Sequence, residues 1–130
     1  MLPPPPPELE PFFVGLEWDQ QLLWSLDLPI EELPTRTLVW HLDLPWWKGE
    51  SGWFTVRPRS VLSDPARYPE QYARTLNADL RYPLHVTLNE GRWTIMDGIH
   101  RLLKAEMLNR DHVPVRKVPA AAFEEIRTAA

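Results

Sequence analysis

Apolar residues recur with helical spacing in two stretches of the chain. In the first, an apolar residue at every fourth position predicts an amphipathic helix over residues 70–80. These positions are Tyr72, Leu76 and Leu80. In the second, an apolar stripe predicts a helix that begins after Gly98 and ends near residue 108. The stripe consists of Ile99, Leu102, Leu103 and Met107. Before residue 70, Pro65 and Pro69 are expected to divide the chain into shorter helical pieces.

Stretches rich in β-branched and aromatic residues predict five strands. They are residues 36–44, 52–56, 83–88, 92–96 and 112–118. The third and fourth flank the hairpin-type turn Asn89-Glu90-Gly91, so we expect these two strands to pair or to lie close together.

Two further stretches have less regular patterns. Residues 12–28 mix aromatic and aliphatic residues with few breakers, which favours a packing segment that is either a short helix or extended. Residues 28–34 lie between Pro29 and Pro34 and indicate a connector with about one helical turn.

The order of these elements is typical of an α+β fold with a small mixed sheet and helices. A chain of 130 residues is long enough for one domain, which we assign to residues 26–119, after an aromatic extension at 12–25. The proline-rich residues 1–11 are expected to sample polyproline II outside the core, as a disordered tail rather than an SH3-type ligand. Residues 120–130 are expected to form a C-terminal tail.

The composition excludes several kinds of chemistry. The chain has no cysteine, so it has no disulfide, no thiolate zinc site and no thiol nucleophile. No stretch approaches the roughly 18 apolar residues of a membrane span, and the N-terminus carries Pro3–Pro7 instead of the basic segment of a secretion signal. We therefore expect a cytoplasmic protein that does not enter a membrane.

Charge is distributed unevenly along the chain. Residues 1–50 carry nine acidic and two basic residues, whereas residues 51–130 carry nine acidic and twelve basic residues. The second part is therefore able to receive an anion. The net charge of the whole chain is −4, which disfavours nucleic acid as a partner, because general DNA binding normally needs a strong basic excess.

The sequence Asp97-Gly98-Ile99-His100-Arg101 joins a predicted strand to a predicted helix. Gly98 lets the backbone approach a ligand closely, and the unpaired N–H groups at a helix start favour an anion. His100 and Arg101 add donors in the first helical turn, and the guanidinium fork fits phosphate oxygens. The alternative is a sharp turn with two solvated side chains, and the spacing alone does not separate the two interpretations.

Residues 85–115, HVTLNEGRWTIMDGIHRLLKAEMLNRDHVPV, resemble the core of the ParB/sulfiredoxin superfamily. There a strand ends in a D/G-G-x-H/R-R turn, a helix follows, and a loop leads to a strand with a V/I-P-V pattern, here Val113-Pro114-Val115. The upstream DLRYPLHV is similar to the segment in which a proline precedes the first strand. The resemblance covers residues 54–119, and residues 26–53 more loosely, and it implies a ParB/sulfiredoxin-like fold.

Members of this superfamily cradle nucleotide phosphates in this turn. The resemblance therefore implies that ATP, ADP or CTP binds with Mg²⁺ at Gly98, Ile99, His100 and Arg101. Its branches include CTP-binding DNA clamps, ATP-dependent sulfinic acid reductases, free-serine kinases, and nucleases or ATPases. Ile99 replaces the reactive cysteine of the reductases, and we expect no second domain of the clamp type. The kinase-like branch has the closest turn and places an acid after the first strand, a position that Glu32 matches loosely.

We therefore expect a small enzyme that hydrolyses a nucleoside phosphate or transfers its phosphoryl group to a small acceptor. Glu32, Asp97 and His100 are the candidate catalytic residues, and Asp97 is alternatively a helix cap. Mg²⁺ is expected to bind through the nucleotide, without dedicated protein ligands.

Two alternatives to this phosphate-transferring or phosphate-hydrolysing enzyme remain. One is a non-enzymatic, nucleotide-gated or partner-binding module whose tryptophan-rich first half contacts a protein. The other is a DNA-partition or nuclease-related factor, which the net charge disfavours.

Other candidate contacts lie between the predicted strands. Trp46 and Trp47 are candidates to stack on a base or a sugar, with Asp43 beside them to contact a hydroxyl group or a metal, although a core-plus-lid role is favoured. Arg57 and Arg59 share one face of an extended stretch and are candidates for phosphates or for a partner's carboxylates, with solvated side chains as the favoured alternative.

His41 and Asp43 alternate with apolar residues and are expected on one face of a strand. Together with His85 they are a candidate metal site, but their spacing matches no established zinc pattern, so we do not expect a structural metal.

Overall fold

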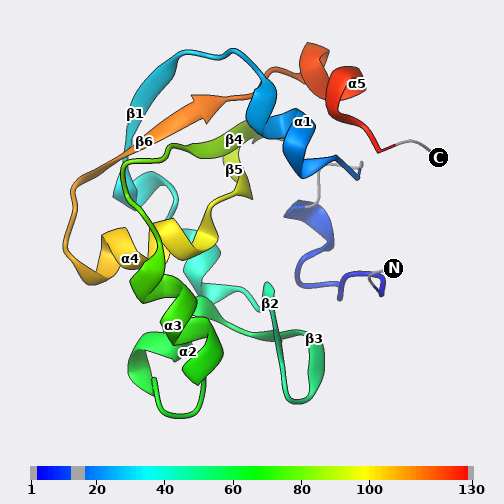
Figure 1. Cartoon of the computed structure of the whole chain (residues 1–130). Helices are drawn as coiled ribbons and strands as arrows, with labels where there is room; N and C mark the ends of the chain where they lie inside the picture. Colours follow the sequence, from blue (N-terminus) through cyan, green and yellow to red (C-terminus); the bar gives the residue numbers. More distant parts are fainter. Residues whose placement is uncertain (1–2, 13–16, 129–130) are drawn as a thin grey trace.

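The computed structural model describes residues 3–12 and 17–128, with a four-stranded sheet at its centre (Figure 1). The strand order is β1-β6-β4-β5. The strands span Ile30–Pro34 (β1), Leu84–Asn89 (β4), Arg92–Asp97 (β5) and His112–Lys117 (β6). β6 pairs antiparallel with β1 and parallel with β4, and β4 pairs antiparallel with β5. A separate hairpin joins β2 (Trp47–Gly49) to β3 (Gly52–Val56). The chain therefore has the predicted α+β class with a mixed sheet.

The hairpin of β4 and β5 follows from local sequence. Glu90 and Gly91 both have positive φ angles, 51° and 78°, as the two central residues of a type I′ turn do. The predicted strands at 83–88 and 92–96 and their pairing are confirmed.

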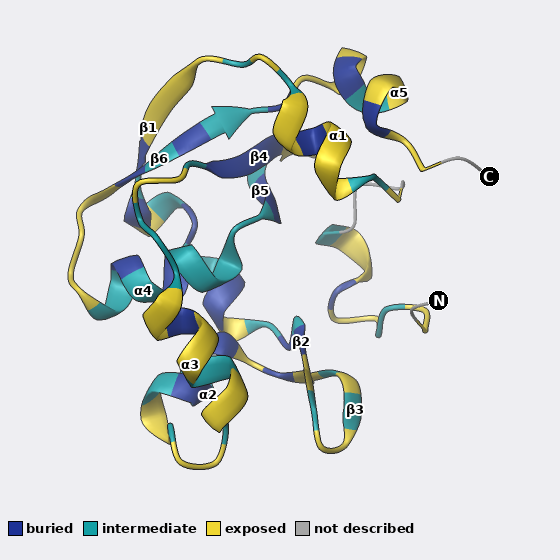
Figure 2. Ribbon diagram, viewed as in Figure 1, coloured by how far each residue is buried: buried dark blue, intermediate teal, exposed yellow. Residues whose placement is uncertain are grey.

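One face of the sheet is covered by α4 (Ile99–Met107), against which α2 (Pro58–Ser63) and α3 (Pro69–Asn77) pack (Figures 1 and 2). Both predicted helices, 70–80 and 99–108, are confirmed. α3 ends three residues earlier than expected, because Lys104 Nζ donates to the Leu76 and Ala78 carbonyls and Ala78 is extended.

The opposite face is covered by α1 (Gln20–Ser25) and α5 (Phe123–Ile126). Ile95 belongs to the cluster on the α4 side and Met96 to the cluster on the α1 side, because successive residues of a strand face opposite sides. The second cluster consists of Leu23, Met96, Val118, Ala122 and Ile126. The sheet is thus the middle layer of three.

The expected C-terminal tail differs in the structure. Residues 120–126 form the 3₁₀ helix η4 (Ala120–Ala122) and α5, and Ile126 is fully buried. Its carbonyl accepts a hydrogen bond from Asp19 N at 2.8 Å, so this segment holds the start of α1.

The proline-rich segment also differs from the expected free tail. Leu9 is fully buried, and Glu8 forms an ion pair with Arg57 at 2.8 Å. The 3₁₀ helix η1 (Glu10–Phe12) follows, and the Phe12 ring lies 4.7 Å from that of Trp40. Of the predicted packing segment at 12–28, residues 13–16 lie outside the described residues, and 20–25 form α1.

The strand predicted at 36–44 is wrong. The chain there forms the 3₁₀ helices η2 (Thr35–Thr37) and η3 (Val39–Asp43). Leu38 and Leu42 are both fully buried, and so is His41, which stands three residues after Leu38, the spacing at which side chains of a 3₁₀ helix lie on one face. His41 is buried with them, so it does not share an exposed strand face with Asp43.

The connector predicted at 28–34 is also wrong, because it contains edge strand β1. Only Leu33 and, in part, Pro34 are shielded from solvent, so the apolar alternation that signals a strand is absent. An edge strand tolerates proline at its ends, where no ladder hydrogen bond is lost.

Among the residues that the structure describes, no helix combines the length and the apolar character that crossing a membrane requires.

Candidate functional site

The turn between β5 and α4 requires glycine at position 98. Gly98 has a φ angle of +120°, and a Cβ atom there would lie 2.7 Å from Leu84 Cγ. Asp97 ends β5 and Ile99 begins α4, as the sequence predicts. The absence of a side chain at Gly98 thus lets the turn sit directly against β4.

The first turn of α4 has no side-chain cap. The Gly98 carbonyl accepts from Leu102 N, which begins the helical ladder. The N–H groups of Ile99, His100 and Arg101 precede that ladder and lie at the positive end of the helix dipole. This arrangement favours an anion in front of the helix.

The carboxylate of Asp97 is held on both oxygens. Trp24 Nε1 donates to Oδ2 at 2.8 Å, and Gln20 Nε2 donates to Oδ1 at 3.0 Å. Arg101 Nη2 also donates to Oδ2 at 2.9 Å, and its Nη1 donates to the Pro83 carbonyl at 2.6 Å. Asp97 and Arg101 therefore fix the turn to α1 and to the start of β4, and the guanidinium fork is not directed outward.

His100 packs between two elements. Its ring stacks on Trp47 with centroids 4.2 Å apart, and Nε2 lies 2.7 Å from Gln71 Oε1. Burial, together with the positive charges of Arg74 and Arg101, lowers the pKa of His100 to about 4. The ring is therefore neutral at pH 7 and donates Nε2–H to the glutamine.

Arg74 is a site residue that the sequence alone does not indicate. It is exposed on α3, three residues after Gln71, and its charge acts on His100. Its guanidinium forms no ion pair with any residue in ranges 3–12 and 17–128. The i, i+3 spacing of Gln71 and Arg74 on one helix face is the signal that could have associated them.

Glu32 is not brought to the turn. It is exposed on β1, whereas Asp97 ends β5 at the other edge of the sheet. Three strand spacings of about 4.8 Å separate these edges by about 14 Å. A group that contacts Asp97 is thus out of reach of the Glu32 carboxylate.

The two adjacent tryptophans are internal. Trp47 is only 9% exposed beneath His100, so its ring is not available to a base. Trp46 is half-buried, and its Nε1 donates to the His41 carbonyl at 2.7 Å. Both therefore join η3 and β2 to the core, and Trp47 also supports the turn.

The charged candidates near β2 are paired with one another. Arg59 Nε donates to Asp43 Oδ1 at 2.7 Å, and Arg57 pairs with Glu8 at 2.8 Å. Arg57 also donates to the Asp43 carbonyl. These contacts hold the N-terminal segment and α2 together, and none of them involves residues 97–101.

His41 and His85 differ in how their ring nitrogens are satisfied. His41 Nδ1 lies 2.7 Å from the Leu38 carbonyl, and Nε2 accepts from Ile95 N at 2.9 Å. Burial lowers the pKa of His41 to about 4, which keeps this bridging ring neutral. His85 is 5% exposed, and neither of its nitrogens has a partner among the described residues. Among residues 3–12 and 17–128, no group of three or more side chains that could hold a metal ion is found.

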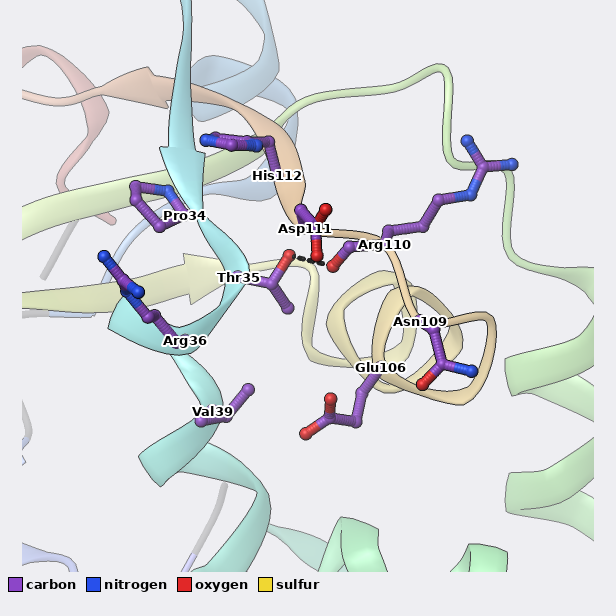
Figure 3. Close-up of a pocket in the computed structure, with 9 residues that line it drawn as sticks. All are labelled: Pro34, Thr35, Arg36, Val39, Glu106, Asn109, Arg110, Asp111 and His112. Carbon is purple, nitrogen blue, oxygen red and sulfur yellow. Dashed lines mark hydrogen bonds between the residues drawn. The ribbon is translucent and has the colours of Figure 1, made fainter.

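A cavity of about 470 Å³ lies near the C-terminal end of α4 (Figure 3). Residues from the end of β1, η2, α4 and the start of β6 line it, and Thr35 Oγ1 donates to the Arg110 carbonyl at its wall. None of the residues of the turn at 97–101 lines this cavity.

Comparison with known protein families, with curated proteins and with solved structures found no match to this chain. Any proposal about function therefore rests on the geometry of the turn.

Proposed function

We propose that this chain is a small ParB/sulfiredoxin-like protein that binds a nucleoside phosphate and hydrolyses it or transfers its phosphoryl group to a small acceptor. The proposal rests on the uncapped first turn of α4 behind Gly98 and on Arg74, whose charge acts on His100 and whose guanidinium forms no ion pair with a described residue. Backbone N–H groups and a free guanidinium are the donors that phosphate oxygens prefer.

In this site the backbone and Arg74 bind, and other residues position them. Ile99 and His100 offer their N–H groups, while the stack of His100 on Trp47 fixes the start of the helix. Two N–H groups of Arg101 help to position the turn, because they donate to Asp97 and to the Pro83 carbonyl.

Phosphoryl transfer depends chiefly on positioning and on charge stabilisation. The described residues contain no cluster of metal ligands, so Mg²⁺ would bind through the nucleotide phosphates. Asp97 is the acid of the turn, and it would orient an acceptor only after Gln20 and Trp24 release an oxygen.

This last point favours a second candidate, a nucleotide-binding module without turnover. Both oxygens of Asp97 are engaged by α1 and Arg101, and Glu32 lies at the opposite sheet edge. Such a protein would bind the nucleotide and pass the signal to a partner.

Calorimetry with ATP, ADP, CTP and GTP, each with and without Mg²⁺, tests nucleotide binding. We expect Arg74→Ala to weaken binding by about 1.5–3 kcal/mol, the range for a hydrogen bond to a charged group, without loss of stability. Arg67→Ala is the matched control, because this exposed arginine lies over Tyr68 just before α3. Equal affinities of both variants and the parent chain would contradict the proposed site.

Turnover assays with amino acid, sugar and nucleoside acceptors then separate the two candidates. Consumption of the bound nucleotide supports the enzyme. Saturable binding without consumption in any of these assays supports the binding module.

A further inference from the structure

His85 is a buried polar group for which the fold provides no partner. Its side chain is 5% exposed, and both Nδ1 and Nε2 are shielded from solvent without a hydrogen bond to any described residue. Unpaired buried donors and acceptors destabilise a protein and are rare. His41 shows the usual case, since both of its nitrogens are bonded. The ring nitrogens of His85 are therefore available to hydrogen-bond a ligand.

The surroundings of His85 carry excess positive charge. His85 pairs in register with Arg116 of β6 on one side and Asp97 of β5 on the other. Residues that pair across strands share a face, so the three side chains leave the sheet together. Arg101 of α4 is the third charged group that acts on His85. Two guanidinium groups and one carboxylate, beside a helix N-terminus, favour an anion over a cation.

Helix α1 covers this face of the sheet. Leu23 anchors the helix in the apolar cluster of Met96 and Ile126, and Gln20 and Trp24 attach it to Asp97. The ring nitrogens of His85 are shielded from solvent in this arrangement. Because α1 binds the carboxylate of Asp97, which pairs in register with His85, movement of α1 is a route by which a ligand can reach them.

We propose that His85, Arg116 and Arg101 form an internal phosphate subsite, and that α1 is the cover that moves to admit the phosphate. The inference rests on the proposed function, because it places the terminal phosphoryl group of the nucleotide behind the turn at 97–101, on the face of the sheet that α1 covers. One ring nitrogen of His85 donates to a phosphate oxygen, and N–H groups of the two arginines that are not already used bind the others.

NMR of the histidine rings in the full chain tests this subsite directly, with inorganic phosphate and pyrophosphate as probes. We expect a saturable shift of the His85 signals and a rise in the pKa of His85, because a bound anion stabilises the imidazolium. Unshifted His85 signals, or equal shifts of all four histidines, would overturn the subsite. If nucleotides bind in calorimetry but the His85 signals do not shift, only this inference fails. If neither the phosphate probes nor the nucleotides bind, the proposed function fails as well.

A pair of substitutions distinguishes a ligand group from a structural one. We expect His85→Leu to abolish phosphate binding while the Tm stays the same or rises, because an unsatisfied group is removed. His41→Leu is the matched control and should lower the Tm, since Ile95 N and the Leu38 carbonyl lose their partner. A fall in Tm for His85→Leu as large as that of the control would show a structural role and overturn the inference.

A second pair tests the cover. Trp24→Phe removes the hydrogen bond to Asp97, which favours the open position of α1, and should tighten phosphate binding by about tenfold. Leu22→Ala is the control, since Leu22 is exposed on the same helix and should leave the affinity unchanged. Unchanged or weaker binding by Trp24→Phe would overturn the cover.

Discussion

Gly98 is the residue on which the geometry of the turn depends most directly. A side chain there meets both a φ angle of +120° and the Leu84 side chain, so we expect Gly98→Ala to lower the free energy of unfolding by about 3 kcal/mol. Gly91→Ala is the matched control: Gly91 has a φ angle of +78° with open space around it, so only backbone strain of about 1 kcal/mol is expected. Denaturant unfolding measures both values, and equal losses would contradict the close packing on Leu84.

Loss of charge is expected to destabilise the protein at Asp97 but to have little effect at Glu32. Asp97→Asn leaves the mostly buried Arg101 without its counter-charge, so we expect a loss of about 1.5–3 kcal/mol in the free energy of unfolding. Glu32→Gln changes an exposed side chain and should stay within about 0.5 kcal/mol. Thermal unfolding checks both, and a larger effect at Glu32 would mean that β1 contributes to the site after all.

At the residue scale, the sequence predicts the turn at 97–101 but not what surrounds it. The turn is contiguous, so its glycine and its place between a strand and a helix can be recognised directly. Gln20 and Trp24 reach Asp97 from 77 and 73 residues away, and no local pattern associates them. The surroundings of His85 cannot be predicted from the sequence for the same reason, because its neighbours come from β5, β6 and α4.

At the scale of elements, α5 differs from expectation, because it packs in the core where the sequence predicts a C-terminal tail. Ile126→Ala empties a fully buried position in the cluster that joins α1 to the sheet, so we expect a loss of about 2–5 kcal/mol in the free energy of unfolding. Leu88→Ala is the control, since Leu88 is 58% exposed on β4. Urea unfolding measures both variants. Equal free energies of unfolding would mean that residues 120–126 do not pack in the core.

Elements with local signals could be predicted, and elements fixed by distant contacts could not. The Glu90-Gly91 turn and the four-residue spacing in α3 are local, and both predictions hold. The segment at 36–44 alternates like a strand, but burial of Leu38 and Leu42 under α4 selects 3₁₀ helices. β1 forms because β6 offers it a partner, and its own sequence is mostly exposed.

The molecule as a whole should lose stability in mild acid, because burial lowers the pKa of three histidines. Burial lowers the pKa of His41 and His100 to about 4 and also lowers the pKa of His85. The unfolded chain binds protons at about pH 6.5, so it takes up more protons than the folded chain between pH 6.5 and 4. Stability therefore falls as the pH falls through this window.

For His41 and His100, these values correspond to a loss of about 2 kcal/mol each in the free energy of unfolding between pH 7 and pH 5. Urea unfolding at the two pH values measures the sum. The carboxylate of Asp79 does not contribute in this range, because its ordinary pKa already lies below pH 5 and Arg81 lowers it further, to about 2. The same stability at both pH values would mean that the rings are charged in the folded chain.

The open side of β1 has a consequence for how copies of this molecule meet in solution. A free strand edge is a template on which a second chain can add its own strand, and this is a common route to aggregation. Here Pro29 and Pro34 carry no N–H at either end of the strand, and the exposed carboxylate of Glu32 repels its counterpart on an identical edge, whereas Glu31 pairs with Lys117 at 3.3 Å. Glu32, which does not contact the turn at Asp97, thus disfavours the association of two copies through the edge of β1.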